Sequence, residues 1–179
     1  MSQLLKGEHV FLRPLEPGDI DFIHFIENDT EVWKVSDTLI PYSRYQVEQY
    51  VLNTQHDIFS EKQIRFVIEK EDVSSSLIGA IDLYDFDPIH RRAGIGVMII
   101  SAEREKGYAG EALSLLITYA FKVLQLHQVF SYISALNTPS IHLFETAGFE
   151  KCGERKEWRL ENGHWRDEWM YQLIRKENL

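Results

Sequence analysis

The sequence predicts one domain of the α+β, or mixed α/β, class. Asn162-Gly163 lies between two strand-like runs, which is the strongest short signal for a β-hairpin. Residues 111–125 show helical periodicity with a single narrow polar stripe, as in a helix packed deep against a sheet. Residues 92–100 are almost continuously apolar, which is typical of a strand buried on both faces. The expected order of elements is β-α-α-β-β-β-α-β-α-β-β.

Apolar spacing defines the elements of the first half of the chain. The pattern predicts a strand at 9–15, a helix at 18–28, an irregular segment at 29–42 and a second helix at 43–53. Pro14 and Pro17 stop the strand, because proline cannot donate to a hydrogen-bonded ladder. Ile20, Ile23 and Ile26 recur at helical spacing and give the first helix its apolar face. The irregular segment could form a loop over a pocket.

The second half of the chain is richer in strands. Strands are expected at 65–69, 77–86, 92–100, 128–135, 154–161 and 164–174. A short helix follows the fourth of these, with Thr138 as its N-cap and Pro139 at its first position. Gly148 ends that helix as a left-handed cap. Hairpins are therefore expected in the middle and at the end of the chain.

Composition limits the classes of function. The chain has 179 residues and a net charge of -9, with 28 acidic residues against 19 lysines and arginines. This balance argues against a nucleic-acid partner, which needs a basic patch, and it permits a cationic substrate such as an amine. A single cysteine, Cys152, excludes an intramolecular disulfide framework and suits the reducing cytoplasm. The apolar runs are too short to span a bilayer, so no membrane partner is expected.

The turn before the long helix carries the clearest chemistry. It contains two cationic side chains, two glycines and an alanine, in the run Arg104, Glu105, Lys106, Gly107, Tyr108, Ala109 and Gly110. Small residues at the start of a helix let an anion approach backbone N–H groups that have no partner within the helix. The helix dipole favours the same negative charge. The pattern therefore predicts a diphosphate site, and the alternative is a tight turn that needs glycine for its geometry alone.

Two motifs resemble those of the GNAT N-acetyltransferase superfamily. Arg104-x-x-Gly107-x-Ala109 is similar to the coenzyme A pyrophosphate motif of that family. A second family segment is similar to the run that contains Asn137, Ser140, Phe144 and Gly148-Phe149. Within the superfamily, residues 12–16, 90–93, 99–101 and 162–166 look most like bacterial spermidine N-acetyltransferases, and ribosomal-protein N-terminal acetyltransferases come next.

The resemblance implies a fold and a cosubstrate site. The fold would be a central, mostly antiparallel sheet that splays at its middle strand, flanked by about four helices, and Gly94 and Gly96 could host a bulge there. Acetyl-CoA would bind at the splay, with its pyrophosphate on the turn at 104–110. Backbone groups would pair with its pantetheine arm from Met98, Ile99 and Ile100. Side chains of the short helix would line the far side: Asn137, Ser140 and Phe144.

The implied chemistry needs a base, an oxyanion donor and an acid. A primary amine has a pKa near ~10.4 and arrives protonated, so a group must remove its proton before it attacks the thioester. A backbone N–H of Met98 or Ile99 would stabilise the oxyanion. The thiolate of CoA then leaves and takes up a proton.

Two positions depart from the family pattern. Phe144 stands where members usually carry a tyrosine acid, and Gly94 stands where the spermidine enzymes carry a glutamate. Asp82 and Tyr84 share one face of the strand at 77–86 and are the candidate replacements, with Asp82 taking the proton of the amine and Tyr84 donating to the thiolate. The alternative is that Asp82 is a solvated strand residue and Tyr84 ordinary packing.

The sequence-based prediction is a single acetyltransferase domain over residues 1–179, acetyl-CoA-dependent and acting on a polyamine or other small amine. The alternatives are an N-terminal acetyltransferase of a protein and a CoA-binding protein without turnover. No metal is expected, because the seven histidines show no ligand spacing. The resemblance implies a homo-oligomer, a dimer or larger. An acidic cluster is either solvated surface or an attraction for a cationic acceptor: Glu27, Asp29, Glu31 and Asp37.

Overall fold

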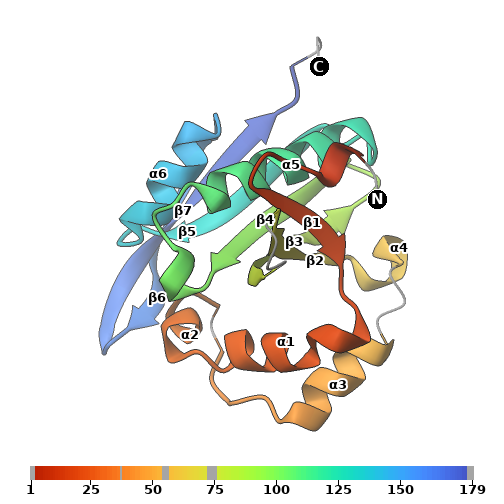
Figure 1. Ribbon diagram of the computed structural model, residues 1–179. Helices are drawn as coiled ribbons and strands as arrows, with labels where there is room; N and C mark the ends of the chain where they lie inside the picture. Colours follow the sequence, from red (N-terminus) through yellow and green to blue (C-terminus); the bar gives the residue numbers. More distant parts are fainter. Residues whose placement is uncertain (1–2, 37, 54–56, 72–75, 177–179) are drawn as a thin grey trace.

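A seven-stranded sheet forms the centre of the computed structural model, which describes residues 3–36, 38–53, 57–71 and 76–176 (Figure 1). The strand order is β1-β2-β3-β4-β5-β7-β6, and every neighbouring pair is antiparallel except the parallel pair β4 and β5. The strands are β1 (Val10–Pro14), β2 (Ile64–Lys70), β3 (Leu77–Asp87), β4 (Arg92–Ile99), β5 (Gln128–Ser134), β6 (Glu150–Glu161) and β7 (His164–Ile174). The expected α+β class and mostly antiparallel sheet are confirmed.

Helices cover both faces of this sheet (Figure 1). They are α1 (Ile20–Glu27), α2 (Thr30–Ser36), α3 (Arg44–Asn53), α4 (Ile58–Glu61), α5 (Tyr108–Lys122) and α6 (Thr138–Thr146). The larger core lies under α5 and α6, where Leu113, Leu116 and Phe144 are buried against the strands. A smaller core lies under α1 and α3, through Ile23 and Val47. The sheet therefore has a separate helical layer on each side.

Two of these helices were not expected. α2 lies within residues 29–42, for which the sequence predicts an irregular segment. Its first turn is held by Asp29, whose side chain accepts from the backbone N–H of Glu31 at 2.9 Å, and Val32 is 6% exposed. The local cap and the buried valine outweigh the β-branched composition of this segment. The other additional helix, α4, is a single turn capped by Asp57.

The turns at the two ends of α6 differ in how well the sequence predicts them. Asn137, not Thr138, is the N-cap, since its side chain accepts from the backbone N–H of Ser140 at 3.2 Å. Both residue types are good caps, so propensity alone could not separate them. Gly148 has φ +90° and ends the helix as predicted.

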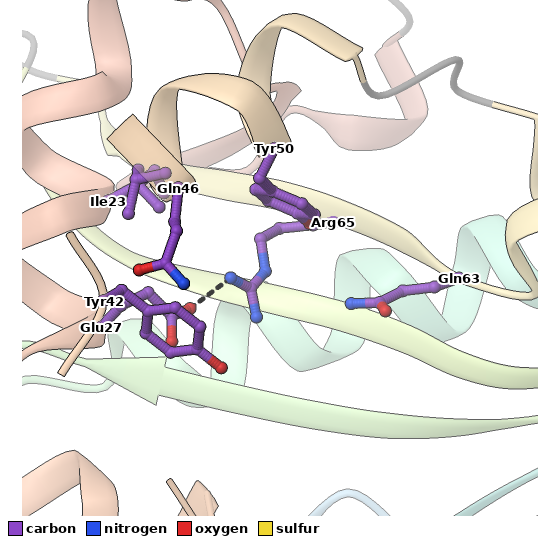
Figure 2. A pocket seen from close by; sticks show the side chains of 8 residues that line it. Ile23, Glu27, Tyr42, Gln46, Tyr50, Gln63 and Arg65 are labelled. Carbon is purple, nitrogen blue, oxygen red and sulfur yellow. Dashed lines mark hydrogen bonds and ion pairs between the residues drawn. The ribbon is translucent and has the colours of Figure 1, made fainter. Parts of the chain in front are cut away.

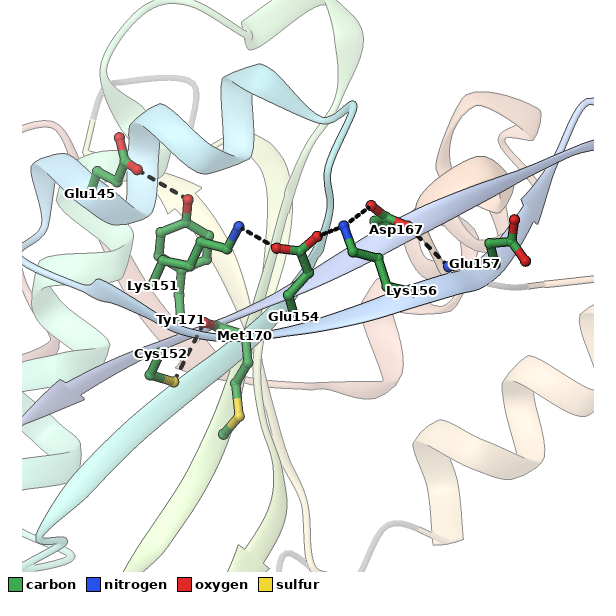
Figure 3. A network of polar contacts seen from close by, with 9 residues as sticks. All are labelled: Glu145, Lys151, Cys152, Glu154, Lys156, Glu157, Asp167, Met170 and Tyr171. Atoms are coloured by element: carbon green, nitrogen blue, oxygen red, sulfur yellow. Dashed lines mark hydrogen bonds and ion pairs between the residues drawn. The ribbon is translucent and has the colours of Figure 1, made fainter.

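The C-terminal hairpin forms as its turn sequence predicts. Asn162 and Gly163 have φ of 50° and 78°, the left-handed pair that a tight hairpin turn requires. A chain of ion pairs crosses β6 and β7 at Lys151, Glu154, Lys156 and Asp167 (Figure 3). Tyr171 on β7 donates to the carboxylate of Glu145 on α6 at 3.0 Å, which ties the hairpin to that helix. None of the helices in the described segments is long and apolar enough to cross a bilayer.

Candidate active site

The strands β4 and β5 separate at the centre of the sheet. Residues 92–94 pair with residues 128–130, and beyond Gly94 the described strands are no longer paired with each other. The bulge that accompanies this gap is in β3 and not, as expected, at Gly94 and Gly96. Tyr84 pairs with Gly94 and Asp87 with Arg92, so β3 carries the extra residue. Two neighbouring strands that are not paired here leave backbone groups available to a ligand.

Successive residues of β4 direct their backbone N–H and C=O groups alternately toward β3 and toward this gap. The N–H of Ile100 donates to the carbonyl of Ile78 on the β3 side at 2.9 Å. Residues two apart on an antiparallel strand direct their backbone groups to the same neighbour, so Met98 also faces β3. Of the three residues expected to pair with pantetheine, Ile99 is therefore the one whose backbone groups face the gap.

The turn at 104–110 presents backbone N–H groups and an open space. Gly107 has φ +87° and precedes the first residue of α5, so Tyr108, Ala109 and Gly110 belong to the first helical turn. The N–H groups of Gly110 and Glu111 already donate to the carbonyl of Gly107 at 3.1 and 3.2 Å. Those of Tyr108 and Ala109 are too early in the helix to have a partner within it. A Cβ at Gly107 would meet no atom within 4 Å, so an anion can approach closely.

The two cationic side chains of this turn bind residues that lie just before it in the chain. Arg104 donates from Nε to the carbonyl of Ile99 at 3.0 Å. Lys106 donates to the carbonyl of Ala102 at 2.9 Å and pairs with Glu103 at 3.0 Å. Glu105 has a positive φ of 62°. The turn therefore offers an anion mainly its backbone amides and the dipole of α5.

The short helix α6 lies beside the first turn of α5. A Cβ at Gly110 would be in ordinary contact with Leu143, at 3.8 Å. Asn137 and Ser140 sit together at the N-terminus of α6, where the amide side chain caps the backbone. Phe144 is 3% exposed and packs edge-on against Phe149 with ring centroids 4.9 Å apart. Phe144 is thus part of the core, with no polar atom to offer.

A cavity of about 710 Å³ opens on the other face of the sheet, below α1 and α2. Both candidate catalytic residues, Asp82 and Tyr84, line it, together with Met98 of β4. Ser131 and Tyr132 of β5 also line it, so the cavity reaches both strands that border the gap. A ligand in this cavity is therefore next to whatever enters between β4 and β5.

Asp82 is held by Arg65, which sequence reasoning did not single out. Arg65 donates to both carboxylate oxygens of Asp82, from Nε at 2.7 Å and from Nη2 at 3.0 Å, and from Nη1 to Glu27. Figure 2 shows the bond between Arg65 and Glu27. Burial lowers the pKa of Arg65, but the two carboxylates prevail and hold it well above its ordinary value. Glu27 and Asp82 therefore share one permanent cation.

Tyr84 points its ring across β4. A Cβ at Gly94 would lie 2.3 Å from the ring, and the ring meets Phe130 of β5 edge-on at 6.0 Å. Burial raises the pKa of Tyr84 to about 12, and hydrogen bonds with the backbone of Tyr132 and the side chain of Ser131 offset part of that effect. Its hydroxyl is therefore a proton donor at the gap that stays protonated near neutral pH.

The β6–β7 hairpin closes the far side of the cavity. Glu168, which is 4% exposed, pairs with Arg155 at 3.1 Å and Arg159 at 3.3 Å. The guanidinium of Arg155 stacks on Tyr132 at 4.0 Å and on Trp158 at 4.9 Å. Sequence reasoning missed this set and Arg65, because only the pairing register of the strands and the packing of α1 on the sheet bring these charges together.

The acidic cluster of the early helices is divided by the fold. Glu27 lines the cavity, whereas Asp29 and Glu31 belong to the capped start of α2. Asp37 lies outside the described residues. In the described ranges, no group of three or more His, Cys, Asp or Glu side chains is arranged to hold a metal ion.

The gap, the amide-rich turn and the N–H of Ile99, which faces the gap, fit a long cosubstrate with a diphosphate. Comparison with known proteins agrees. An acetyltransferase (GNAT) domain model matches residues 9–150. The spermidine N(1)-acetyltransferase of Vibrio cholerae is 30% identical over 159 residues, which cover 87% of each chain.

Solved structures are similar over the same length. The crystal structure of the Vibrio cholerae spermidine N-acetyltransferase in complex with CoA and spermine matches with a TM-score of 0.82 and 29% identity, over 92% of this chain and 95% of that one. A dodecameric structure of the Vibrio cholerae enzyme matches with a TM-score of 0.77 and 28% identity, over 92% and 93% of the two chains. The chain belongs to the GNAT acetyltransferase family and is an acetyl-CoA-dependent N-acetyltransferase.

Proposed function

We propose that this enzyme acetylates a primary amine of a polyamine or another small aliphatic amine, in the cavity beside the gap between β4 and β5. The observation that carries the proposal is the position of Glu27 and Asp82, two carboxylates with one shared cation, on the wall of that cavity. An excess carboxylate attracts an ammonium group. The names of the related enzymes, which act on spermidine, support the same class of acceptor.

Each step of the transfer has a candidate residue. When bound, acetyl-CoA supplies the acetyl group as a thioester with a good leaving group. Asp82 holds the incoming ammonium and takes its proton through water, because both carboxylate oxygens already accept from Arg65. The N–H of Ile99 faces the gap and serves the oxyanion. Tyr84, whose hydroxyl is protonated near neutral pH as in any tyrosine, returns a proton to the sulfur.

Tyr84 takes over the task that a tyrosine on α6 has in other family members. Phe144, which occupies that position, is buried against Phe149 and has no proton to give. Tyr84 reaches the gap from the opposite face of the sheet, over Gly94. The absence of a side chain at position 94 is therefore what allows Tyr84 to lie there.

The test is an amine panel with acetyl-CoA, in which free thiol is measured. Thiol release with spermidine or a diamine but not with peptides supports the proposal. Release with peptides alone would favour an N-terminal acetyltransferase instead. Tight binding of CoA without thiol release from any amine would indicate a CoA-binding protein without turnover.

We also propose that the enzyme is a homo-oligomer in the cytoplasm. The dodecameric structure of the related enzyme supports self-association. So do the exposed apolar side chains of the hairpin, since Trp158, Leu160 and Trp165 are each more than half exposed. A lone thiol, Cys152, is compatible with a reducing compartment. Light scattering coupled to size exclusion tests the assembly, and a monomeric mass would contradict it.

A further inference from the structure

A second cavity adjoins the acceptor cavity, between α1, α3 and β2 (Figure 2). Its volume is about 290 Å³, and Glu27, Gln63 and Arg65 line both cavities. These shared side chains form the boundary between the two spaces. The acetyl transfer itself, which takes place at the gap between β4 and β5, makes no use of the smaller cavity.

The ion pair at this boundary is asymmetric. Arg65 gives two hydrogen bonds to Asp82 but only one to Glu27, at Oε1. The second oxygen of Glu27 has no hydrogen-bond partner within the part of the chain that the structure describes. Because a carboxylate can accept several hydrogen bonds, Glu27 can bind a further donor while Arg65 stays on Asp82.

The local charge favours a cationic donor. Glu27, Asp82 and Arg65 sum to one net negative charge. On the hairpin side of the larger cavity, Arg155 and Arg159 pair with the carboxylates of Glu168 and Glu161, so the charges there sum to zero. A cation that enters is therefore attracted to the net negative set beside α1 rather than to the neutral hairpin.

The walls of the smaller cavity suit an alkylammonium group. Tyr42 supplies an aromatic ring, whose face attracts cations, and the ring of Tyr50 already holds the guanidinium of Arg65 at 5.8 Å from its centroid. Ile23 and Val47 supply an apolar surface for methylene groups. Ammonium without an alkyl chain could not make these apolar contacts.

We infer that the smaller cavity is the subsite for the distal ammonium of a diamine or polyamine acceptor, and that Glu27 is its anionic partner. The reacting nitrogen then lies in the larger cavity near Asp82, and the carbon chain passes the boundary beside Arg65. The inference rests on the proposed function and adds to it that the enzyme selects acceptors with a second charged nitrogen.

The experiment compares putrescine with butylamine, which has the same carbon chain but a single nitrogen. Binding is measured by calorimetry and turnover by thiol release, for wild type, Glu27→Gln and Glu48→Gln. Glu48 is the matched control, because it lies on α3 and lines neither cavity. For Glu27→Gln we expect the Kd and KM of putrescine to rise about tenfold or more, with butylamine changed less than about twofold.

A purely structural role for Glu27 predicts a different result. Loss of the ion pair with Arg65 would then weaken both amines equally and lower the melting temperature. Glu27→Asp keeps the charge and should restore part of the preference for putrescine. Equal changes for both amines, or putrescine binding unaffected by Glu27→Gln, would overturn the inference. Absence of thiol release with every amine would instead contradict the proposed function, while calorimetry would still test the subsite.

Discussion

The ring of Tyr84 lies over the backbone of Gly94, where a Cβ would come within 2.3 Å of it. The two residues are directly paired across β3 and β4. A side chain at position 94 and the observed orientation of Tyr84 therefore exclude each other. If Tyr84 is the acid, as we propose, this relationship links the two departures of the chain from the family pattern, because glycine at position 94 makes room for that tyrosine.

Gly94→Ala should push the ring of Tyr84 away from the gap. We expect turnover to fall about tenfold or more, and the free energy of unfolding to fall by about 1–3 kcal/mol, as for other overpacked sites. Kinetics and urea unfolding measure the two effects. Gly96→Ala is the control for stability, since its Cβ would lie 3.8 Å from the same ring, an ordinary contact. Unfolding free energies that are equal for the two variants would contradict the packing argument.

Tyr84→Phe removes the hydroxyl and keeps the ring. We expect kcat to fall by about a hundredfold, as on loss of a general acid, with little change in KM. The pKa of Tyr84 is about 12 in the folded protein and near ~10 in the unfolded chain. The folded state thus retains a proton that the unfolded state loses, so this tyrosine lowers stability as pH rises through that interval.

The variant lacks this alkaline loss of stability. Between about pH 9 and pH 11, wild type should therefore lose stability relative to Tyr84→Phe. Unfolding curves at the two pH values give the difference. If wild type and Tyr84→Phe differ in unfolding free energy by the same amount at both pH values, burial does not raise the pKa of Tyr84. If kcat is unchanged in the variant, Tyr84 contributes only packing.

Asp82→Asn keeps the shape of the side chain and removes its charge. If Asp82 takes the proton of the amine, turnover should fall about tenfold or more, and the pH–rate profile should shift. Arg65 keeps its bond to Glu27 in this variant, so the fold should persist with a loss of about 1–3 kcal/mol. Circular dichroism checks the fold. A pH–rate profile identical to that of wild type would exclude Asp82 as the base.

Gly107→Glu places bulk and negative charge at the start of α5. We expect CoA to bind about a hundredfold more weakly in calorimetry, because the anion site depends on backbone amides. Gly107→Ala separates this effect from backbone strain, since φ +87° costs any L-residue about 1–2 kcal/mol. The alanine variant should lose stability but keep most of its affinity. CoA binding that Gly107→Glu leaves unaltered would remove the proposed pyrophosphate site.

Local signals were enough to predict most elements of the fold. Asn162-Gly163 and Gly148 each need a positive φ, which few residues adopt, and both turns formed as expected. The α2 helix was missed because its support is the cap by Asp29 and the burial of Val32, and burial depends on the tertiary structure. The sequence alone could not show the bulge in β3, because a bulge is defined by the register of two strands.

Some parts of the candidate site follow from local sequence, and others depend on the tertiary structure. The anion turn follows from consecutive residues, so it could be predicted as a unit. The partnership of Arg65 with Asp82 and Glu27 joins β2, β3 and α1, and no spacing along the chain indicates it. The direction of the backbone at Ile99 likewise depends on which neighbour Ile100 pairs with.

The join between β4 and β5 extends over only residues 92–94 and 128–130. One half of the sheet, with α1 and α3, carries Glu27, Arg65 and Asp82, whereas α6 and the hairpin belong to the other half. The acceptor cavity is lined by residues of both halves, so its shape depends on how this short ladder holds them together.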